Sequence, residues 1–293
     1  MSERNNGQVS RDRRDRRISL AELKELELQL LLDFASYCDA HHYVYWLGGG
    51  TLLGAVRHQG FIPWDDDIDI MMPREDYEQA LRRYAHPFYA VESIVVRRDS
   101  WLRYARLNDT RTALRSNYKA SCRECVFIDI FPIDGLPRHR MMQEFMYAVE
   151  KVLITGTLAA IMTYTPSNRY HDREDGVLHW KYWRRTLVKY LLISLLGKTR
   201  PCWWARAADR FARRVPFQTA ATVGCLVSGP HGTKEIMPRE VFSGQIPVRF
   251  EGHTFHGLPA YDAYLSKLYG DYRKLPPVKL RQTHHDFVAY WND

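Results

Sequence analysis

Residues 45–70 read YWLGGGTLLGAVRHQGFIPWDDDIDI, and this stretch decides the fold. It joins an apolar strand over residues 43–47, three glycines, a short helix that we expect to begin near Thr51, and an acidic strand. Without a Cβ atom, the glycine backbone can approach a phosphate group closely, and the start of a helix offers amide groups to an anion. We therefore expect Gly49 and Gly50 to bind phosphate through their backbone amides, with the hydroxyl of Thr51 beside them.

The acidic strand presents a row of carboxylates. Side chains alternate between the two faces of an extended strand, so Asp65, Asp67 and Asp69 should project from one face, while Ile68 and Ile70 project from the other. Neighbouring members of the row would have Cα atoms about 6.5 to 7 Å apart, and ionised carboxylates this close repel one another unless a cation lies among them. Oxygen ligands without a nearby cysteine favour Mg²⁺ or Mn²⁺.

Simpler explanations exist for each part of this pattern. Most glycine runs are turns, and an exposed edge strand can carry charges that prevent aggregation. A calcium-binding EF-hand loop is a poor match, because Ile70 stands where that loop needs glycine and Asp76 stands where glutamate is usual. The order of all the parts within one short stretch favours a catalytic site over these alternatives.

A further carboxylate lies in another strongly apolar strand. Asp129 stands within residues 126–131, and a buried carboxylate is costly unless it meets a cation or hydrogen-bond donors. We therefore expect Asp129 to point at the metal. Asp134 follows Pro132 and precedes Gly135, so we interpret it as a turn residue.

The sequence GGTLLGAVRHQGFIPWDDDIDI resembles the LicD family, which is related to the fukutin-type transferases. The segments IDIFPIDGLP and AYDAYLSKLYGDYRKLPP also follow the pattern of that family. The resemblance is dense over residues 45–77, weaker over 104–137 and 248–284, and thin elsewhere. It implies an α/β (α+β) fold with a polymerase-beta-like nucleotidyltransferase core, in which helices flank a mixed sheet.

The same resemblance implies a reaction. LicD-type enzymes transfer phosphocholine to cell-surface glycans, so the expected donor is CDP-choline or a related CDP-alcohol. The expected acceptor is a hydroxyl of a cell-envelope glycan such as lipopolysaccharide or teichoic acid, and CMP is released. Phosphoryl transfer needs charge neutralisation and in-line positioning, which clustered aspartates with Mg²⁺ provide. We assign Asp67 and Asp69 as metal ligands, Asp65 as a further ligand or an orienting group, and Asp129 as a ligand or the base that accepts the hydroxyl proton.

Basic and aromatic residues complete the expected site. Arg57 and His58 lie near the phosphate-binding turn, although helical spacing can also direct Arg57 outward. Arg106 and Arg111 are candidates for binding the phosphates of the nucleotide, and the alternative is that both are surface arginines beside a strand. The quaternary ammonium of choline prefers aromatic faces, and three candidate residues could provide them: Trp64, Tyr269 and Tyr272.

The whole chain has the composition of a basic globular protein, with 293 residues, 45% apolar residues and a net charge of +8. Residues 1–17 have no apolar core, so we interpret them as a disordered basic tail and not as a signal peptide. Residues 18–293 are expected to form one catalytic domain with a helical insertion over about residues 138–216. Cys122 and Cys125 have no second pair at zinc-finger spacing, which favours reduced thiols in a cytoplasmic protein.

Tryptophan and arginine gather in the predicted insertion, between residues 180 and 206. This composition suits peripheral contact with the inner face of the cell membrane, where a lipid-linked glycan acceptor would also lie; the alternative is a plain helical cap on the core. Its apolar stretch, residues 187–196, is far shorter than the ~20 residues that span a bilayer. The basic charge alone does not predict a nucleic-acid partner, because no recognition motif is present.

Two other functions fit the same residues. A nucleotidyltransferase would use the same carboxylates to move a nucleotide onto a sugar or small acceptor, and it would release pyrophosphate. A non-catalytic member that binds a glycan or a protein would have no need to keep the aspartate row. Analysis of the products separates these possibilities.

Overall fold

The computed structural model describes residues 16–115, 124–162, 183–227, 231–278, 281 and 287–292. Most of the predicted basic tail, Cys122 and part of the predicted insertion therefore lie outside the described residues.

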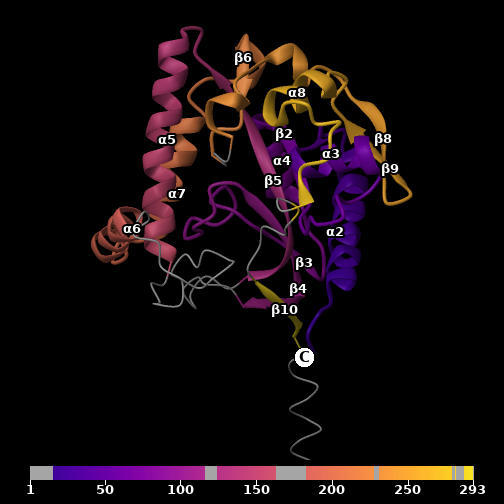
Figure 1. The fold of residues 1–293 in the computed structure, drawn as a ribbon, viewed down its shortest axis with the longest axis horizontal. Coiled ribbons are helices and arrows are strands. Elements are labelled where there is room, and N and C mark those ends of the chain that lie inside the picture. Colours follow the sequence, from indigo (N-terminus) through magenta and orange to yellow (C-terminus); the bar gives the residue numbers. More distant parts are fainter. Residues whose placement is uncertain are drawn as a thin grey trace, which may run out of the picture.

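A mixed β-sheet forms the centre of the fold, with the strand order β1-β2-β5-β4-β10 (Figure 1). β2 and β5 run parallel, whereas the other neighbours in this path are antiparallel. The parallel pair requires a crossover connection, and the helix α4 lies within it. This arrangement confirms the predicted α/β fold with a mixed sheet flanked by helices. The bounds of these elements are β1 (Trp46–Leu47), β2 (Asp69–Pro73), α4 (Arg74–Arg83), β4 (Ala105–Arg115), β5 (Glu124–Leu136) and β10 (Val288–Trp291).

Shorter strands extend the sheet. β3 (Tyr89–Glu92) pairs with the first part of β4, β6 (Thr222–Gly224) pairs with the end of β5, and β7 (Met237–Pro238) pairs with β6. β8 (Ile246–Phe250) and β9 (His253–Gly257) form a separate hairpin.

The composition of residues 91–97 and 101–108 predicts two strands, but residues 93–104 are irregular, so the predicted bounds are wrong. The hydroxyls of Ser93 and Ser100 accept hydrogen bonds from the amides of Val95 and Leu102, at 3.3 and 3.2 Å. Such local contacts compete with strand pairing.

Helices cover both sides of this sheet (Figure 1). On one side lies α2 (Leu20–Ala40), whose start is capped by Ser19, since the amide of Glu22 donates to the hydroxyl of Ser19. On the other side stand α5 (Arg140–Ile161) and α7 (Pro201–Ala212), and α6 (Trp183–Leu196) packs on α5. None of the described helices is long and apolar enough to cross a membrane.

One end of the sheet is covered by shorter helices (Figure 1). α3 begins at the glycine turn, two residues earlier than expected, and α8 comes from the last third of the chain. Three short 3₁₀ turns complete this region. The elements are α3 (Gly49–His58), α8 (Tyr261–Tyr269), η3 (Phe217–Thr219), η4 (Gly232–Glu235) and η5 (Arg239–Phe242).

The acidic strand is shorter than predicted. A turn closed by the amide of Asp65 and the carbonyl of Ile62, at 2.9 Å, precedes it, so regular pairing as β2 begins only at Asp69. The predicted alternation is still present in the burial pattern. Asp66 and Ile68 are buried, whereas Asp65, Asp67 and Asp69 are partly accessible.

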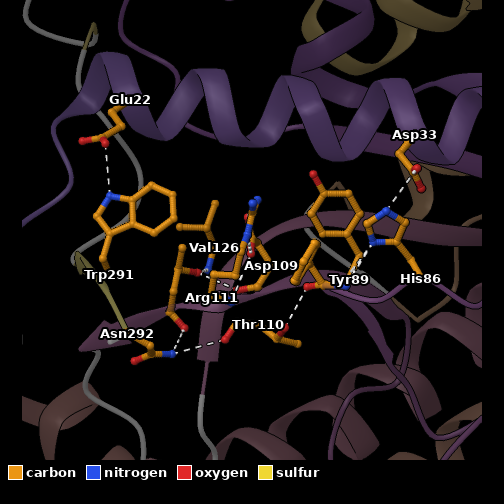
Figure 2. Close-up of polar contacts among 12 residues, drawn as sticks. Glu22, Asp33, His86, Tyr89, Asp109, Thr110, Arg111, Val126, Trp291 and Asn292 are labelled. Atoms are coloured by element: carbon orange, nitrogen blue, oxygen red, sulfur yellow. Dashed lines mark hydrogen bonds and ion pairs between the residues drawn. The ribbon is translucent and has the colours of Figure 1, made fainter.

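Polar contacts hold the last strand on the sheet, as Figure 2 shows. The indole nitrogen of Trp291 donates to Glu22 on α2 at 3.1 Å, and the side-chain amide of Asn292 donates to the carbonyl of Thr112 on β4 at 2.6 Å. β10 therefore joins the first helix to the edge of the sheet.

Candidate active site

Asp69 and Asp129 lie side by side on the parallel strands. The register of β2 and β5 pairs these two residues, and the amide of Asp129 donates to the carbonyl of Ile68 at 2.9 Å. Neighbouring strands lie about 4.8 Å apart, so the two carboxyl groups leave the sheet from adjacent positions. Strand pairing thus brings together aspartates that are distant in the sequence.

A second group of carboxylates precedes β2. Oxygen atoms of Asp65, Asp66 and Asp67 lie within 4.8 Å of one another, and among the described residues this is the one such group of side chains that can bind a metal. Asp66 was not selected from the sequence, because a regular strand would have turned it away from its neighbours. The irregular backbone before Asp69 allows it to approach them.

Repulsion among these carboxylates favours a cation. Burial raises the pKa of Asp69 well above its ordinary value, and the nearby charges of Asp67, Asp129 and Asp65 raise it further. The Asp69 side chain is surrounded by protein but is partly accessible through the cavities described below. Carboxylate oxygens are the ligands that Mg²⁺ and Mn²⁺ prefer, so the donor set fits such an ion.

Glu27 adds a buried carboxyl group behind this cluster. It lies on α2, is 2% exposed, and its Oε2 atom has no hydrogen-bond partner among the described residues. Burial raises its pKa well above the ordinary value, and the charges of Asp67 and Asp66 raise it further. The ionised form of Glu27 is therefore disfavoured when no cation lies nearby.

The glycines allow carboxylates to approach the start of α3. A Cβ atom on Gly49 would lie 2.6 Å from Oδ2 of Asp69, and a Cβ atom on Gly50 would lie 2.6 Å from Oδ2 of Asp65. Gly49 also has a φ of +44°, which side chains disfavour. Its amide donates to the hydroxyl of Tyr264 at 3.3 Å. The positive end of the α3 dipole therefore faces the aspartates.

Thr51 and Arg106 hold the aspartates in place. The hydroxyl of Thr51 is buried and accepts the amide of Asp69 at 2.8 Å. Arg106 donates to Oδ1 of Asp129 at 2.9 Å and to Glu124 at 2.5 Å, and its guanidinium carbon lies 3.7 Å from the ring centroid of Phe127. Both side chains, which were expected to bind phosphate, therefore contact the strands that carry the aspartates.

Two cavities meet at the aspartates. The small cavity, of about 300 Å³, and the large cavity, of about 730 Å³, share four lining residues: Asp67, Asp69, His231 and Tyr269. The small cavity is also lined by Gly49, Met71, Arg103, Tyr104, Asp129, Phe131, Cys225, Glu235 and Tyr264. The large cavity is also lined by residues that include Gly50, Arg57, Trp64, Asp65, Tyr272 and Lys274. A ligand with two ends could therefore occupy both cavities and cross the aspartates at its middle.

Of the remaining predicted residues, some line these cavities and others lie outside them. Arg57 turns toward the large cavity, and its Nη1 donates to the carbonyl of Tyr272 at 2.9 Å. His58 lies outside both linings and packs edge to face against Trp64, with 6.5 Å between the ring centroids. Arg111 pairs with Asp109 at 2.6 Å beside β10, as Figure 2 shows, and lines neither cavity.

Several cavity residues were missed from the sequence. His231 and Glu235 belong to a short 3₁₀ turn and its cap, which has no periodic pattern. Burial lowers the pKa of His231, and burial raises the pKa of Glu235 to about 8. Arg103 and Tyr104 directly precede β4, in a segment that was interpreted as strand. Glu235 directly follows Lys234 in a polar segment, so its sequence neighbours contain no signal that points to a cavity.

Comparisons with known proteins agree with the resemblance of the central stretch. The nucleotidyltransferase domain described as LicD/FKTN/FKRP matches residues 42–154, which include the glycine turn and every aspartate of the site. The lipopolysaccharide cholinephosphotransferase LicD of Haemophilus influenzae is 29% identical over 286 residues, which cover 94% of this chain and 99% of that protein. The human ribitol 5-phosphate transferase FKRP is 59% identical over 32 residues, which cover 11% of this chain and 6% of that protein.

Proposed function

We propose that this chain is a LicD-type enzyme, because the LicD/FKTN/FKRP domain matches residues 42–154 and a LicD protein is similar over nearly the whole chain. It is a phosphotransferase that moves a phospho-alcohol from a CDP-alcohol to a hydroxyl of a cell-envelope glycan and releases CMP. The preferred donor is CDP-choline. The similarity to a lipopolysaccharide cholinephosphotransferase over nearly the whole length of both chains supports this donor and this class of acceptor.

One observation carries the proposal. Asp67, Asp69 and Asp129 line one cavity, although Asp129 comes from a different strand, and two of them also line a second, larger cavity. Clustered carboxylates between two ligand-sized spaces suit a diphosphate that joins two different groups.

A divalent cation, Mg²⁺ or Mn²⁺, would be held by Asp65, Asp67, Asp69 and Asp129. When bound, it neutralises charge on the phosphates of the donor. Asp66 shares the tight carboxylate group with Asp65 and Asp67, and it is the natural substitute if one of the other four does not bind the ion. Arg106 fixes Asp129 through the hydrogen bond to Oδ1.

The transfer exchanges one phosphorus–oxygen bond for another. The hydroxyl oxygen of the acceptor forms a bond with the phosphorus of the phospho-alcohol, while the bond from that phosphorus to the bridging oxygen of CMP breaks. The electron pair of the broken bond leaves with CMP. Asp129 is the proposed acceptor of the hydroxyl proton, because it lies in the small cavity beside Asp69. Arg57 and Lys274 in the large cavity would bind the nucleotide phosphates.

The alternative is a nucleotidyltransferase that moves a nucleotide onto a sugar or small acceptor and releases pyrophosphate. The matched domain is named for that chemistry, and the same aspartates would serve it. Purified protein should therefore be incubated with Mg²⁺, purified lipopolysaccharide and, separately, CDP-choline, CDP-ribitol and nucleoside triphosphates. We expect CMP from CDP-choline, and no product after chelation of the metal. Pyrophosphate from a triphosphate would favour the alternative.

Substitution of the aspartates tests the site itself. Asp67→Ala and Asp69→Ala should each lower turnover by at least about 100-fold, because each removes a carboxylate that would hold the cation, and the cation neutralises and positions the phosphates. The control is Asp39→Ala, which removes an exposed carboxylate that pairs with His256 outside both cavities. Thermal unfolding should show that all three variants are folded. Full activity in Asp67→Ala or Asp69→Ala would contradict the assignment.

A further inference from the structure

We propose that the small cavity binds the cationic headgroup of the donor alcohol, and that Glu235 and the aromatic rings around it make the enzyme selective for a positively charged alcohol. This inference rests on the proposed function, because it assumes a CDP-alcohol whose diphosphate lies at Asp67 and Asp69. The two ends of the donor would bind in different cavities, and residues outside the aspartate cluster would determine the selectivity for the alcohol.

Aromatic side chains form much of the wall of the small cavity. Four rings line it, from the segment before β4, from β5 and from α8: Tyr104, Phe131, Tyr264 and Tyr269. The ring centroids of Tyr104 and Phe131 lie 4.7 Å apart, so these two form one continuous surface. The faces of aromatic rings carry partial negative charge and attract quaternary ammonium groups. Such a wall suits choline better than a polyhydroxylated alcohol.

Glu235 adds a carboxyl group to this wall. It lines the small cavity only, it is 9% exposed, and the amide of His231 donates to its Oε1 atom at 3.4 Å. Burial raises the pKa of Glu235 to about 8 in the protein alone. A fixed positive charge beside this carboxyl group would stabilise its ionised form. A cationic ligand therefore gains both an ion pair and contact with the rings.

The charged side chains that line the two cavities indicate which end of the donor each cavity binds. The large cavity contains the basic side chains of Arg57 and Lys274, which suit the phosphates of a nucleotide, and its volume is more than twice that of the small cavity. The basic side chain in the small cavity is Arg103, whose Nε donates to the carbonyl of Val227 at 3.2 Å and whose guanidinium carbon lies 5.8 Å from the ring centroid of Tyr104. The large cavity has two basic side chains beside its four carboxyl groups, whereas the small cavity has this one arginine beside four carboxyl groups: Asp67, Asp69, Asp129 and Glu235.

The position of the aspartates is consistent with this division. Asp67 and Asp69 line both cavities, so the diphosphate would lie where the cavities meet. Tyr269 also lines both cavities, and burial, followed by the charges of Asp69 and Asp65, raises its pKa. The short ethyl linker of choline would then place the ammonium group within the small cavity.

The test compares CDP-choline with its neutral isostere, the CDP derivative of 3,3-dimethylbutanol, in which carbon replaces the quaternary nitrogen. The wild-type protein should prefer CDP-choline in kcat/KM by about 10- to 100-fold. Glu235→Gln keeps the shape of the side chain but removes its charge. It should reduce that preference to a few-fold, mainly by raising KM for CDP-choline, and it should leave the affinity for CMP, measured by calorimetry, unchanged.

Glu150→Gln is the matched control, because Glu150 is also a buried carboxyl whose pKa is raised to about 8, but it lines a separate cavity beside α5. It should leave the preference unchanged. Phe131→Leu removes one ring of the wall, and it should reduce the preference independently if Glu235→Gln proves unstable.

The outcomes separate this inference from the proposed function. If the wild-type protein releases CMP from both donors equally, or if Glu235→Gln impairs both donors equally, the proposed function stands and the cationic subsite is wrong. If the wild-type protein uses neither donor but forms pyrophosphate from a triphosphate, both proposals are wrong.

Discussion

At the scale of single residues, Glu150 is a carboxyl group whose surroundings disfavour a charge. It lies on α5, is 1% exposed, and neither of its carboxyl oxygens has a hydrogen-bond partner among the described residues. Burial raises its pKa to about 8, so the folded protein keeps a proton that the unfolded chain releases near pH 4.5. The folded state binds more protons, and stability should therefore fall as the pH rises from 4.5 through 8. From pH 5 to pH 8 this group should remove about 3 kcal/mol from the free energy of unfolding.

Urea denaturation of the wild-type protein and Glu150→Gln at pH 5 and pH 8 checks this expectation. The free energy of unfolding should fall less in Glu150→Gln over this interval, because glutamine has no proton to lose. Equal losses in the two proteins would show that the carboxyl group of Glu150 finds a partner in solution. Asp69 and Glu235 also have raised pKa values, so the wild-type loss should exceed the share of Glu150.

Among the elements, α4, β5 and α7 are held together by one buried arginine. Arg74 of α4 donates to both oxygens of Asp134 on β5, at 2.6 and 2.7 Å, and to Asp209 of α7 at 3.0 Å. Burial raises the pKa of Asp134 although Arg74 opposes that effect, so this carboxylate depends on its partner. Arg74→Ala should lower the free energy of unfolding by about 3 to 5 kcal/mol, because the buried carboxylate of Asp134 would lose its counter-ion and Asp209 would keep Arg213 but lose Arg74.

Thermal or urea unfolding measures this loss, and the control lies on the same helix. Arg82 is exposed and approaches Glu78 only to 3.9 Å, so Arg82→Ala should cost less than about 1 kcal/mol. Similar losses in the two variants would mean that the buried arginine does not join the three elements.

The same elements show how far the sequence could predict the structure. The capped helix α2, the glycine turn that begins α3 and the apolar strand around Asp129 follow from local patterns, and the structure has all three. The interpretation of Asp134 as a turn residue was wrong: it lies within β5, fully buried, because Arg74 provides a partner from another element. A local pattern of proline and glycine contains no information about that arginine.

In the candidate site, too, some residues could be predicted from the sequence and others could not. The spacing of Asp65, Asp67 and Asp69 indicates a shared face, and the burial of these residues follows the alternation. His231 and Glu235 reach the small cavity from a short turn far along the chain, and no spacing in the sequence relates them to the aspartates. Long-range packing decides such positions, and it could not be predicted from one sequence.

For the molecule as a whole, the described helices of the predicted insertion present apolar side chains at the surface. Leu191 and Leu195 on α6, Trp203 on α7 and Val152 on α5 are 55%, 74%, 59% and 64% exposed. α6 stands at one end of the molecule, beyond α5 (Figure 1). Exposed apolar side chains next to basic ones, such as Lys151 and Arg200, are typical of a surface that contacts anionic lipid.

We predict that the protein sediments with vesicles that contain phosphatidylglycerol, and that the combined change Leu191→Glu and Leu195→Glu lowers the bound fraction at least several-fold. Val278→Glu is the control, because Val278 is 74% exposed but lies outside the insertion. Hydrolysis of the donor in solution should be unaffected by all of these changes. Equal binding of the wild-type and doubly substituted proteins would mean that the apolar surface has another role.

The contacts of β10 also bear on how the fold comes apart (Figure 2). The amide of Ile18 donates to the carbonyl of Ala289 at 2.9 Å, and the amide of Trp291 donates to the carbonyl of Arg16 at 3.0 Å, so the first and last described segments bind each other. Fraying of either segment therefore breaks hydrogen bonds of the other. β10 pairs with β4, and β4 pairs with the strand that carries Asp129, so only two strand pairings separate the chain ends from the candidate site.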